Sequence, residues 1–349
     1  MKKEHILIIR FSALGDVAMT VPVVYSLAMQ YPDLRITVLS RKFARPFFCD
    51  LAPNVNFMEA DLKGEYRGIK GLNALYRRLT SKQFTKIADF HHVLRSDYLR
   101  MRFNIGHYHV EHLDKHRSQR RALIRYKNKV LQQLPTPFEN YADVLAKLGY
   151  PVTLEFKSLF PEEGGNLNLL PAIFGPKKSF ERWIGIAPTA AHPGKCYPMD
   201  RMCRVIELLL QTHPRTRLFL FGRGPQEDLL FGQWCQQMPQ CVYVSQHLEN
   251  LYQELILMSH LDVMLSMDSS NMHLASLTGT PVVSVWGATH PFAGFMGWNQ
   301  PEENAIQVSL DCRPCSIYGN KPCRRGDLAC MNLITPEQIV ARIEQIINP

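Results

Sequence analysis

One acidic side chain lies at the first point in the chain where chemistry is expected. Asp16 ends the segment from Arg10 to Asp16, which follows the apolar run Ile6–Ile9 and precedes the apolar stretch Val17–Val24. This pattern predicts a buried strand, a tight turn and an amphipathic helix, with the carboxylate near the turn. Because ligands of open α/β sheets bind beyond the carboxyl ends of the strands, Asp16 is a candidate general base for a substrate hydroxyl. A simple helix cap is the alternative role for this side chain.

A second polar group follows the apolar run Val263–Ser266. Asp268, Ser269 and Ser270 precede a predicted helix, and His273 falls on the first turn of that helix. The N–H groups at a helix N-terminus attract anions, and small side chains let a phosphate approach the backbone. The segment therefore predicts an anion site, whereas N-capping alone would explain one of these residues but not the position of His273.

Two glycine-containing loops follow two further predicted strands. Thr189 and Lys195 lie after the strand Trp183–Ala187, where an ammonium group could neutralise a leaving phosphate, although a solvent-exposed lysine is the commoner case. The other loop contains Gly222–Gly224 after the strand Arg217–Phe221. It is not the G-x-G-x-x-G fingerprint, which the first turns of both halves lack, and this counts against a nicotinamide-dependent enzyme.

These polar segments are positioned by an alternation of strands and helices that occurs twice along the chain. Strands are predicted at Ile6–Ile9, Ile36–Leu39, Val55–Met58, Ile87–Phe90, Trp183–Ala187, Arg217–Phe221, Val242–Val244, Val263–Ser266 and Val282–Val285. Helices are predicted at Val17–Gln30, Leu72–Ser81, 119–149 with an interruption at Pro135 and Pro137, Met199–Gln211, Asn271–Thr278 and Pro336–Ile347. Strands that alternate with helices imply parallel sheets with βαβ crossovers.

The alternation indicates an α/β protein of two Rossmann-like units in series, joined by a turn-rich linker near residues 161–180. We expect an N-terminal domain at residues 1–165, a second domain at 180–335 and a C-terminal helix at 336–349. Two such units each present strand ends and helix N-termini to a cleft, which suits an enzyme that joins two substrates.

The length and composition are those of a globular protein, with 349 residues of which 46% are hydrophobic and 20% charged. No apolar run approaches the ~20 residues that span a bilayer. The four apolar residues before Arg10 are too few for a signal-peptide core. We therefore expect a cytoplasmic protein.

Positive charge is concentrated in the N-terminal half. Residues 1–157 hold 26 Lys and Arg against 14 Asp and Glu, a net charge of +12, whereas residues 158–349 hold 14 against 17, a net charge of −3. The densest part, from Lys115 to Lys129, has seven basic residues and no acidic one. This asymmetry favours an anionic partner over a merely solvated helix face; the partner could be a nucleic acid, a membrane surface or a phosphorylated substrate.

In combination these motifs resemble glycosyltransferase family 9, the ADP-heptose:lipopolysaccharide heptosyltransferases and their relatives. The resemblance covers nearly the full chain and is carried by the turn Ser12–Asp16, the Lys195 loop, the segment Asp268–His273 and the turn Trp286–Thr289. It implies the GT-B fold, in which two Rossmann-like domains face a central cleft. It also implies an inverting transfer of a heptose, or a related sugar, from an ADP-sugar to the inner core of lipopolysaccharide.

The resemblance implies a role for each matching residue. Asp16 matches the catalytic base, and the other matches contact the donor: Thr189, Lys195, Asp268, Ser269, Ser270 and His273. The nucleoside diphosphate would leave with its charge held by Lys195 and the helix N-terminus, so catalysis would require no metal or other cofactor. Two departures from the family pattern, Ser270 in place of a glycine and the segment Gly222–Gly224, leave the identity of the nucleotide sugar open.

The acceptor in this family is an anionic, phosphorylated glycolipid, which gives the basic half a purpose. We predict that Arg95, Arg120, Arg121 and Arg125 bind its phosphates or carboxylates. The expected partners are a nucleotide sugar, this glycolipid and the inner-membrane surface, on which a cytoplasmic enzyme could be peripheral. The alternatives are a same-fold enzyme with another nucleotide sugar and glycan acceptor, and a nucleic-acid-binding protein, which no RNA- or DNA-binding motif supports.

Four cysteines follow the predicted donor motifs with the spacing C-x2-C-x7-C-x6-C: Cys312, Cys315, Cys323 and Cys330. They could bind zinc or an iron–sulfur cluster, or remain free thiols, and a reducing cytoplasm disfavours disulfides. Because the cluster lies beyond those motifs, we expect any metal there, such as a zinc ion, to be structural and separate from catalysis.

Overall fold

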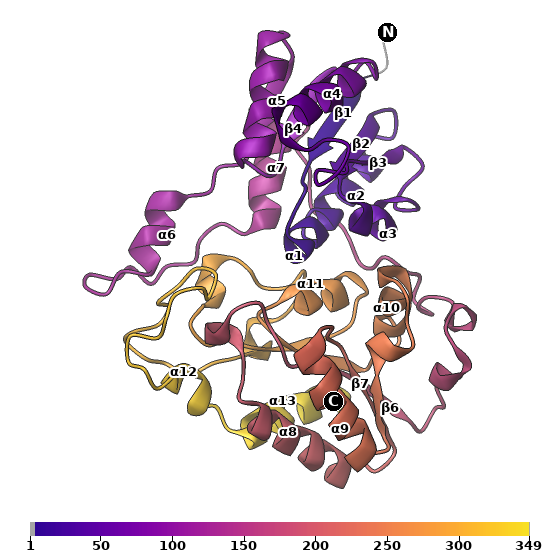
Figure 1. Ribbon diagram of the computed structural model, residues 1–349, viewed down its shortest axis with the longest axis vertical. Helices are drawn as coiled ribbons and strands as arrows, with labels where there is room; N and C mark the ends of the chain where they lie inside the picture. The colour runs from indigo at the N-terminus through magenta and orange to yellow at the C-terminus, as the bar shows by residue number, and fades with distance from the viewer. Residues whose placement is uncertain (1–3, 349) are drawn as a thin grey trace. The chain divides into compact units, whose positions relative to one another are not determined.

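The computed structural model describes residues 4–348 and divides into two compact units, each built on one parallel β-sheet (Figure 1). The first unit comprises residues 4–116 and 135–157. The second comprises residues 117–134 and 158–348. The fold class predicted from the sequence, an α/β protein with two Rossmann-like units, is confirmed.

The first unit has a five-stranded sheet in the order β3-β2-β1-β4-β5, with every neighbouring pair parallel. Its strands are β1 (His5–Ile9), β2 (Arg35–Ser40), β3 (Val55–Glu59), β4 (Lys86–Asp89) and β5 (His109–His112). Its helices are α1 (Leu14–Ala18), α2 (Val21–Gln30), α3 (Arg45–Phe48), α4 (Gly68–Thr80), α5 (Leu94–Ile105) and α7 (Pro137–Lys147). The central strand β1 is buried over its whole length, which explains why it appears in the sequence as an unbroken apolar run.

The second unit has a six-stranded parallel sheet in the order β11-β10-β9-β6-β7-β8. Its strands are β6 (Arg182–Ala187), β7 (Thr216–Leu220), β8 (Cys241–Tyr243), β9 (Val263–Met267), β10 (Val282–Val285) and β11 (Ala305–Ile306). Its helices are α6 (Arg117–Leu123), α8 (Met199–Thr212), α9 (Pro225–Gln237), α10 (Leu251–Met258), α11 (Ser270–Leu277), α12 (Ala329–Asn332) and α13 (Pro336–Ile347).

Both sheets have the same chain order when counted from their own first strand. In each sheet, the first and fourth strands are neighbours, and the strands that follow them lie on opposite sides of this pair. The gap between the ends of two such strands is called the switch point, and doubly wound folds bind ligands there. In the first unit Ile9 pairs with Asp89 at the ends of β1 and β4. In the second unit Ala187 pairs with Ser266 near the ends of β6 and β9. The loops after these strands therefore emerge side by side within each unit.

Most predicted strands agree with the structure within one or two residues, but two predicted helices are divided. The stretch predicted as one helix at Val17–Gln30 forms α1 and α2, and Pro22 lies in the first turn of α2, where a missing N–H is tolerated. The stretch 119–149 forms α6 and α7, with a non-helical connection at residues 124–136. Pro137 begins α7, whose N-cap Thr136 accepts from the N–H of Glu139.

The structure groups two segments differently from the expected domain ranges. Residues 117–134 belong to the second unit, although they precede the expected boundary at residue 165. Their six basic residues leave residues 1–116 and 135–157 with 20 Lys and Arg against 14 Asp and Glu, and give residues 117–134 and 158–349 20 against 17. The charge asymmetry between the units is therefore smaller than between the halves of the sequence. The C-terminal helix α13 is part of the second unit, where it packs against α8.

No helix within residues 4–348 combines the length and the apolar character needed to cross a bilayer.

Candidate active site

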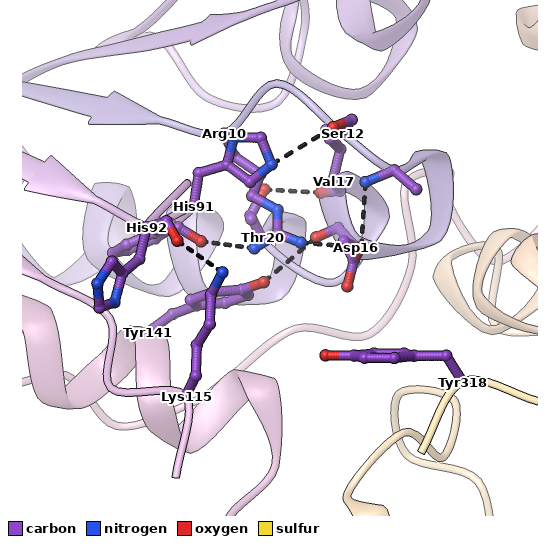
Figure 2. Close-up of polar contacts among 12 residues, drawn as sticks. Arg10, Ser12, Asp16, Val17, Thr20, His91, His92, Lys115, Tyr141 and Tyr318 are labelled. Carbon is purple, nitrogen blue, oxygen red and sulfur yellow. Dashed lines mark hydrogen bonds and ion pairs between the residues drawn. The ribbon is translucent and has the colours of Figure 1, made fainter. Parts of the chain in front are cut away.

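Asp16 lies in the turn beyond β1, as the third residue of the short helix α1 (Figure 2). Its Oδ2 accepts a hydrogen bond from the backbone N–H of Ala13 at 3.0 Å, so the helix-cap role considered for this residue does exist. The same Oδ2 lies 2.8 Å from Nη2 of Arg10. The Asp16 side chain is 33% exposed, whereas the Arg10 side chain is 8% exposed. The carboxylate is thus held by two donors and still reaches solvent.

Arg10 is fixed from the opposite side by the segment that follows β4. Its Nη1 donates to the carbonyl oxygen of Phe90 at 2.6 Å. Burial acts to lower the pKa of Arg10, but Tyr141 and then Asp16 oppose it, and the net pKa is raised. The guanidinium therefore stays charged and provides a permanent cation behind Asp16.

His91 is the second group that β4 delivers to this cluster. Its Nε2 lies 3.3 Å from Oγ of Ser12, in the turn after β1. Burial, and next the charge of Arg10, lower the pKa of His91 to about 3, although Asp16 acts to raise it. The imidazole is therefore neutral at neutral pH. Asp89 fixes this loop, because its Oδ1 accepts from the N–H groups of His91 and His92 at 2.9 and 3.0 Å.

Two further side chains complete the cluster in the first unit. Tyr141 on α7 donates to the carbonyl oxygen of Asp16 at 3.4 Å, and its ring stacks on Phe90 with centroids 4.6 Å apart. Lys115 donates from Nζ to the carbonyl oxygen of His92 at 2.6 Å, as Figure 2 shows. Arg95, predicted to bind the acceptor, is exposed on the first turn of α5, and its charge acts to lower the pKa of His91. Arg10 thus contacts the Asp16 carboxylate directly, whereas the charges of Lys115 and Arg95 act on the neighbouring His91.

The second unit brings Lys195 and Asp268 together at its own switch point. Lys195 lies in the loop after β6 and Asp268 directly after β9, and Nζ of Lys195 is 3.0 Å from Oδ2 of Asp268. Their side chains are 16% and 7% exposed, respectively, so the lysine is the more accessible partner. An ammonium group has three N–H donors, and one carboxylate does not use them all.

The remaining predicted donor residues lie around this ion pair. Ser269 is the N-cap of α11, Ser270 is its first residue, and His273 is buried one turn later. Oγ of Ser269 lies 3.2 Å from Oγ of Ser266, and the amide groups of the first turn of α11 provide positive partial charge. Thr189 is partly exposed in the loop after β6. The donor residues predicted from the sequence thus share one edge of the second sheet.

Close backbone packing holds the Lys195 loop in place. Ala288 donates its N–H to the carbonyl oxygen of Gly194 at 2.8 Å, and a Cβ at Gly194 would lie 2.9 Å from that of Ala288. Gly319 has a φ of +76°, and a Cβ there would overlap the aliphatic part of the Lys195 side chain. Glycine at these positions lets the loops pack closely enough to fix the lysine.

Arg313 ties the C-terminal loop to the turn Trp286–Thr289. It is buried; its Nε donates to the carbonyl oxygen of Gly287 at 2.6 Å, and its Nη2 donates to those of Trp286 and Thr289 at 3.1 and 2.9 Å. Burial lowers the pKa of this guanidinium, which nearby cysteines act to raise. Arg313 shapes a turn that the sequence placed at the site.

The segment Gly222–Gly224 after β7 carries a polar pair. Nη2 of Arg223 lies 3.3 Å from Oε1 of Glu254 on α10. Burial raises the pKa of Glu254, and the Arg223 charge opposes that rise. The pair is a candidate partner for a polar ligand group that the sequence did not assign.

Three of the four arginines predicted to bind the acceptor lie on α6 or just after it, in the second unit, whereas Arg95 lies in the first. Arg120 donates to the Tyr318 hydroxyl at 2.8 Å and lies over the ring of Phe295 at 5.2 Å. Arg121 and Arg125 are exposed. The structure therefore separates one anchored arginine from two that face solvent.

The four C-terminal cysteines line one cavity of about 520 Å³, together with Arg313 and His192. All four are free thiols. Among residues 4–348, however, no three His, Cys, Asp or Glu side chains converge as metal ligands would. The structural zinc therefore stays a prediction.

The sequence did not identify Arg10, Ser12 and His91 as site residues. Arg10 and Ser12 belong to the segment that contains Asp16, and His91 follows the predicted strand Ile87–Phe90, so a signal existed in their positions after apolar runs. What was missing is the adjacency of β1 and β4, which only the sheet order provides.

Two doubly wound units in tandem, each with polar groups beyond its switch point, are the arrangement expected of a GT-B glycosyltransferase. The family model described as glycosyltransferase family 9 (heptosyltransferase) matches residues 72–326. The chain belongs to this family, as the sequence motifs predicted.

Relatives and solved structures agree with this assignment. The chain is 25% identical over 332 residues to lipopolysaccharide heptosyltransferase 3 of Escherichia coli, covering 84% of this chain and 85% of the relative. A family 9 glycosyltransferase from Veillonella parvula superposes with a TM-score of 0.74 at 19% identity, covering 99% and 98% of the two chains. An Escherichia coli heptosyltransferase solved with ADP has a TM-score of 0.68 at 15% identity, covering 98% and 99%. At such identities the superpositions demonstrate a shared fold.

Proposed function

We propose that this protein transfers a heptose, or a related sugar, from an ADP-sugar to the lipopolysaccharide inner core with inversion at the anomeric carbon. One observation carries the proposal: each switch point has an ion pair, and the more exposed partner is a carboxylate in the first unit and an ammonium in the second. A base and a cation are the two groups that this reaction requires.

In the proposed step, an acceptor hydroxyl oxygen attacks the anomeric carbon of the donor sugar as the bond from that carbon to the diphosphate oxygen breaks. Asp16 takes the hydroxyl proton, and Arg10 holds the carboxylate in place through the contact at 2.8 Å. The negative charge that develops on the leaving diphosphate is stabilised by Lys195 and by the amide groups at the start of α11. Thr189 and His273 would contact the donor beside them.

Fixed cations at the donor site make a divalent metal ion unnecessary in this proposal. We expect full activity in the presence of a chelator. The structural zinc at Cys312, Cys315, Cys323 and Cys330 is a separate proposal, supported by the cavity that all four line. Elemental analysis of protein purified with a reductant decides between bound metal and free thiols.

Two similarities support the choice of donor and acceptor. The curated relative is named as a lipopolysaccharide heptosyltransferase, and structures of the fold have been solved with ADP and with ADP-2-deoxy-2-fluoro heptose. In the chain itself, exposed Arg95, Arg121 and Arg125 supply cations that an anionic glycolipid would need. The proposed location is the cytoplasmic side of the inner membrane.

A thermal-shift screen of ADP-, GDP- and UDP-sugars tests the donor assignment. ADP-heptose should raise the melting temperature of the protein, because a ligand that binds the folded state stabilises it, and should do so less in Lys195→Met. A rise with another sugar nucleotide alone would favour the same-fold alternative. No rise with any donor, together with a strongly salt-dependent affinity for RNA, would favour a nucleic-acid-binding protein.

A further inference from the structure

The segment of residues 117–134, here called the basic segment, has one face that is firmly attached to the second unit. Nζ of Lys129 donates to the carbonyl oxygens of Asp311, Arg313 and Pro314 at 3.0, 2.7 and 3.2 Å. The N–H of Leu134 donates to the carbonyl oxygen of Phe292 at 2.9 Å.

Apolar contacts reinforce this attachment. Leu123 and Leu134 are buried in a small cluster with Ala293 and Ile317. Arg120 lies over Phe295 and donates to Tyr318, as described above. The inner face therefore uses two of the six basic residues of the segment for anchoring.

The exposed side chains of the segment, here called its outer face, include the other four basic residues: Arg117, Arg121, Arg125 and Lys127. It also carries large apolar side chains in the same stretch, with Tyr126 70%, Val130 49% and Leu131 57% exposed. No acidic residue occurs from residue 117 to residue 134. The segment therefore exposes positive charge and apolar surface together.

A neighbouring loop of the same unit extends this surface. The guanidinium of Arg324 lies 5.4 Å from the centre of the Tyr126 ring. Lys321 and Arg325 are exposed beside it, although Arg325 is paired with Asp327 at 3.0 Å. The adjoining loop thus adds two basic side chains, Lys321 and Arg324, that form no ion pair within residues 4–348.

We propose that the outer face of the basic segment docks the enzyme on an anionic lipid bilayer. Exposed basic residues are attracted to anionic headgroups, and exposed apolar side chains are stabilised when they enter the interface. A nucleic acid fits less well, because the side chains beside the cations include aliphatic Val130 and Leu131, which offer no stacking surface. The inference rests on the proposed function for the location of the enzyme, but the surface is defined by this chain's own residues.

Sedimentation of the full-length protein with lipid vesicles tests this inference. Vesicles of phosphatidylethanolamine with phosphatidylglycerol, free of any glycan acceptor, should bind the protein, and vesicles of phosphatidylcholine should not. A triple variant, Arg117→Gln, Arg125→Gln and Lys127→Gln, should bind anionic vesicles roughly 100-fold more weakly at low salt, since each basic residue near such a surface contributes about a five-fold factor. The variant Val130→Ser, Leu131→Ser should lose the binding that remains at high salt.

A matched control removes three exposed basic residues elsewhere in the second unit: Lys178→Gln, Arg204→Gln and Arg215→Gln. It should bind vesicles as the wild type does, and melting curves of all variants verify that they fold. Equal losses in the test and control variants, or no binding to anionic vesicles, would overturn the inference. So would a loss of RNA affinity in the test variant with vesicle affinity unchanged. The vesicles hold no acceptor, so a negative sedimentation result does not affect the interpretation of the thermal-shift screen. A negative thermal-shift screen likewise does not affect the interpretation of the sedimentation result.

Discussion

Each switch point of this protein has an ion pair with one buried and one more exposed partner, but the exposed partner is acidic in the first unit and basic in the second. In the first unit, Arg10 is 8% exposed and Asp16 is 33% exposed. In the second unit, the carboxylate of Asp268 is the buried partner at 7%, and Lys195 is the more exposed at 16%. One switch point therefore exposes a carboxylate to solvent, and the other exposes an ammonium group.

The difference follows from where each charged residue lies relative to the strands. Asp16 comes seven residues after the end of β1, on the first turn of α1, whereas Arg10 follows β1 directly and stays within the sheet edge. Asp268 follows β9 directly, and Lys195 lies eight residues after β6 on a loop. In both units the residue directly after the strand is buried and positions a more exposed residue of opposite charge. The charge of that exposed residue decides whether the site can accept a proton or bind an anion.

The largest expected effect is on the first switch point. Asp16→Asn should lower kcat by about 10²–10⁴-fold, the range for loss of a general base, with the affinity for the donor nucleotide unchanged. The amide oxygen of asparagine can still accept from the N–H of Ala13, so α1 should keep its start. Steady-state kinetics with the exposed Asp50→Asn as control measures this. A kcat within a few-fold of wild type would mean that Asp16 serves as a cap alone.

The next effect is on the second switch point. Lys195→Met should weaken the binding of ADP by about 10–100-fold, because a hydrogen bond to a charged group contributes about 1.5–3 kcal/mol. Lys195→Arg should restore part of this affinity, since it keeps the charge. Isothermal titration with ADP gives the constants. An unchanged affinity for ADP in Lys195→Met would mean that the lysine only neutralises the buried carboxylate of Asp268, as a structural ion pair, and does not bind the donor.

The sequence predicted the members of these two pairs to different extents. Lys195 and Asp268 were both predicted at the donor site, because their segments resemble those of the family, but their direct pairing depends on β6 and β9 being neighbours. Asp16 was predicted and Arg10 was not, since nothing local indicates that a residue at a strand end turns toward a helix N-terminus. The fold class could be predicted because buried parallel strands leave apolar runs, and the family because the polar segments after those runs resemble its motifs.

Two features could not be predicted from local pattern. The strand β5 has little apolar content and lies at the sheet edge, so no period revealed it. The basic segment was expected in the N-terminal domain because it precedes residue 165, whereas its two buried leucines, Leu123 and Leu134, pack in the second unit. Which surface accepts two leucines is a property of the tertiary structure.

A smaller effect distinguishes the contribution of Arg10 from that of Asp16. Arg10→Met should lower kcat by about 10-fold and move the acidic limb of the pH–kcat profile to higher pH, because a carboxylate beside a cation loses its proton more readily than one without. Arg10→Lys should restore the limb, since it keeps the positive charge. A purely structural role for Arg10 would reduce the amount of folded enzyme without moving the limb.

The smallest effect concerns His91, which lies beside the Arg10–Asp16 pair in the first unit. Burial lowers its pKa to about 3, so between about pH 3 and pH 6.5 the unfolded chain binds a proton that the folded protein does not. The free energy of unfolding should therefore fall as the pH drops below about 6.5, by up to about 1.4 kcal/mol per pH unit from this residue. His91→Gln should flatten that dependence in urea unfolding from about pH 7 to about pH 5, whereas the exposed His109→Gln should leave it unchanged. Parallel dependences for wild type and His91→Gln would mean that the imidazole is protonated in the folded protein, and Arg10 would then face a second cation instead of a neutral ring.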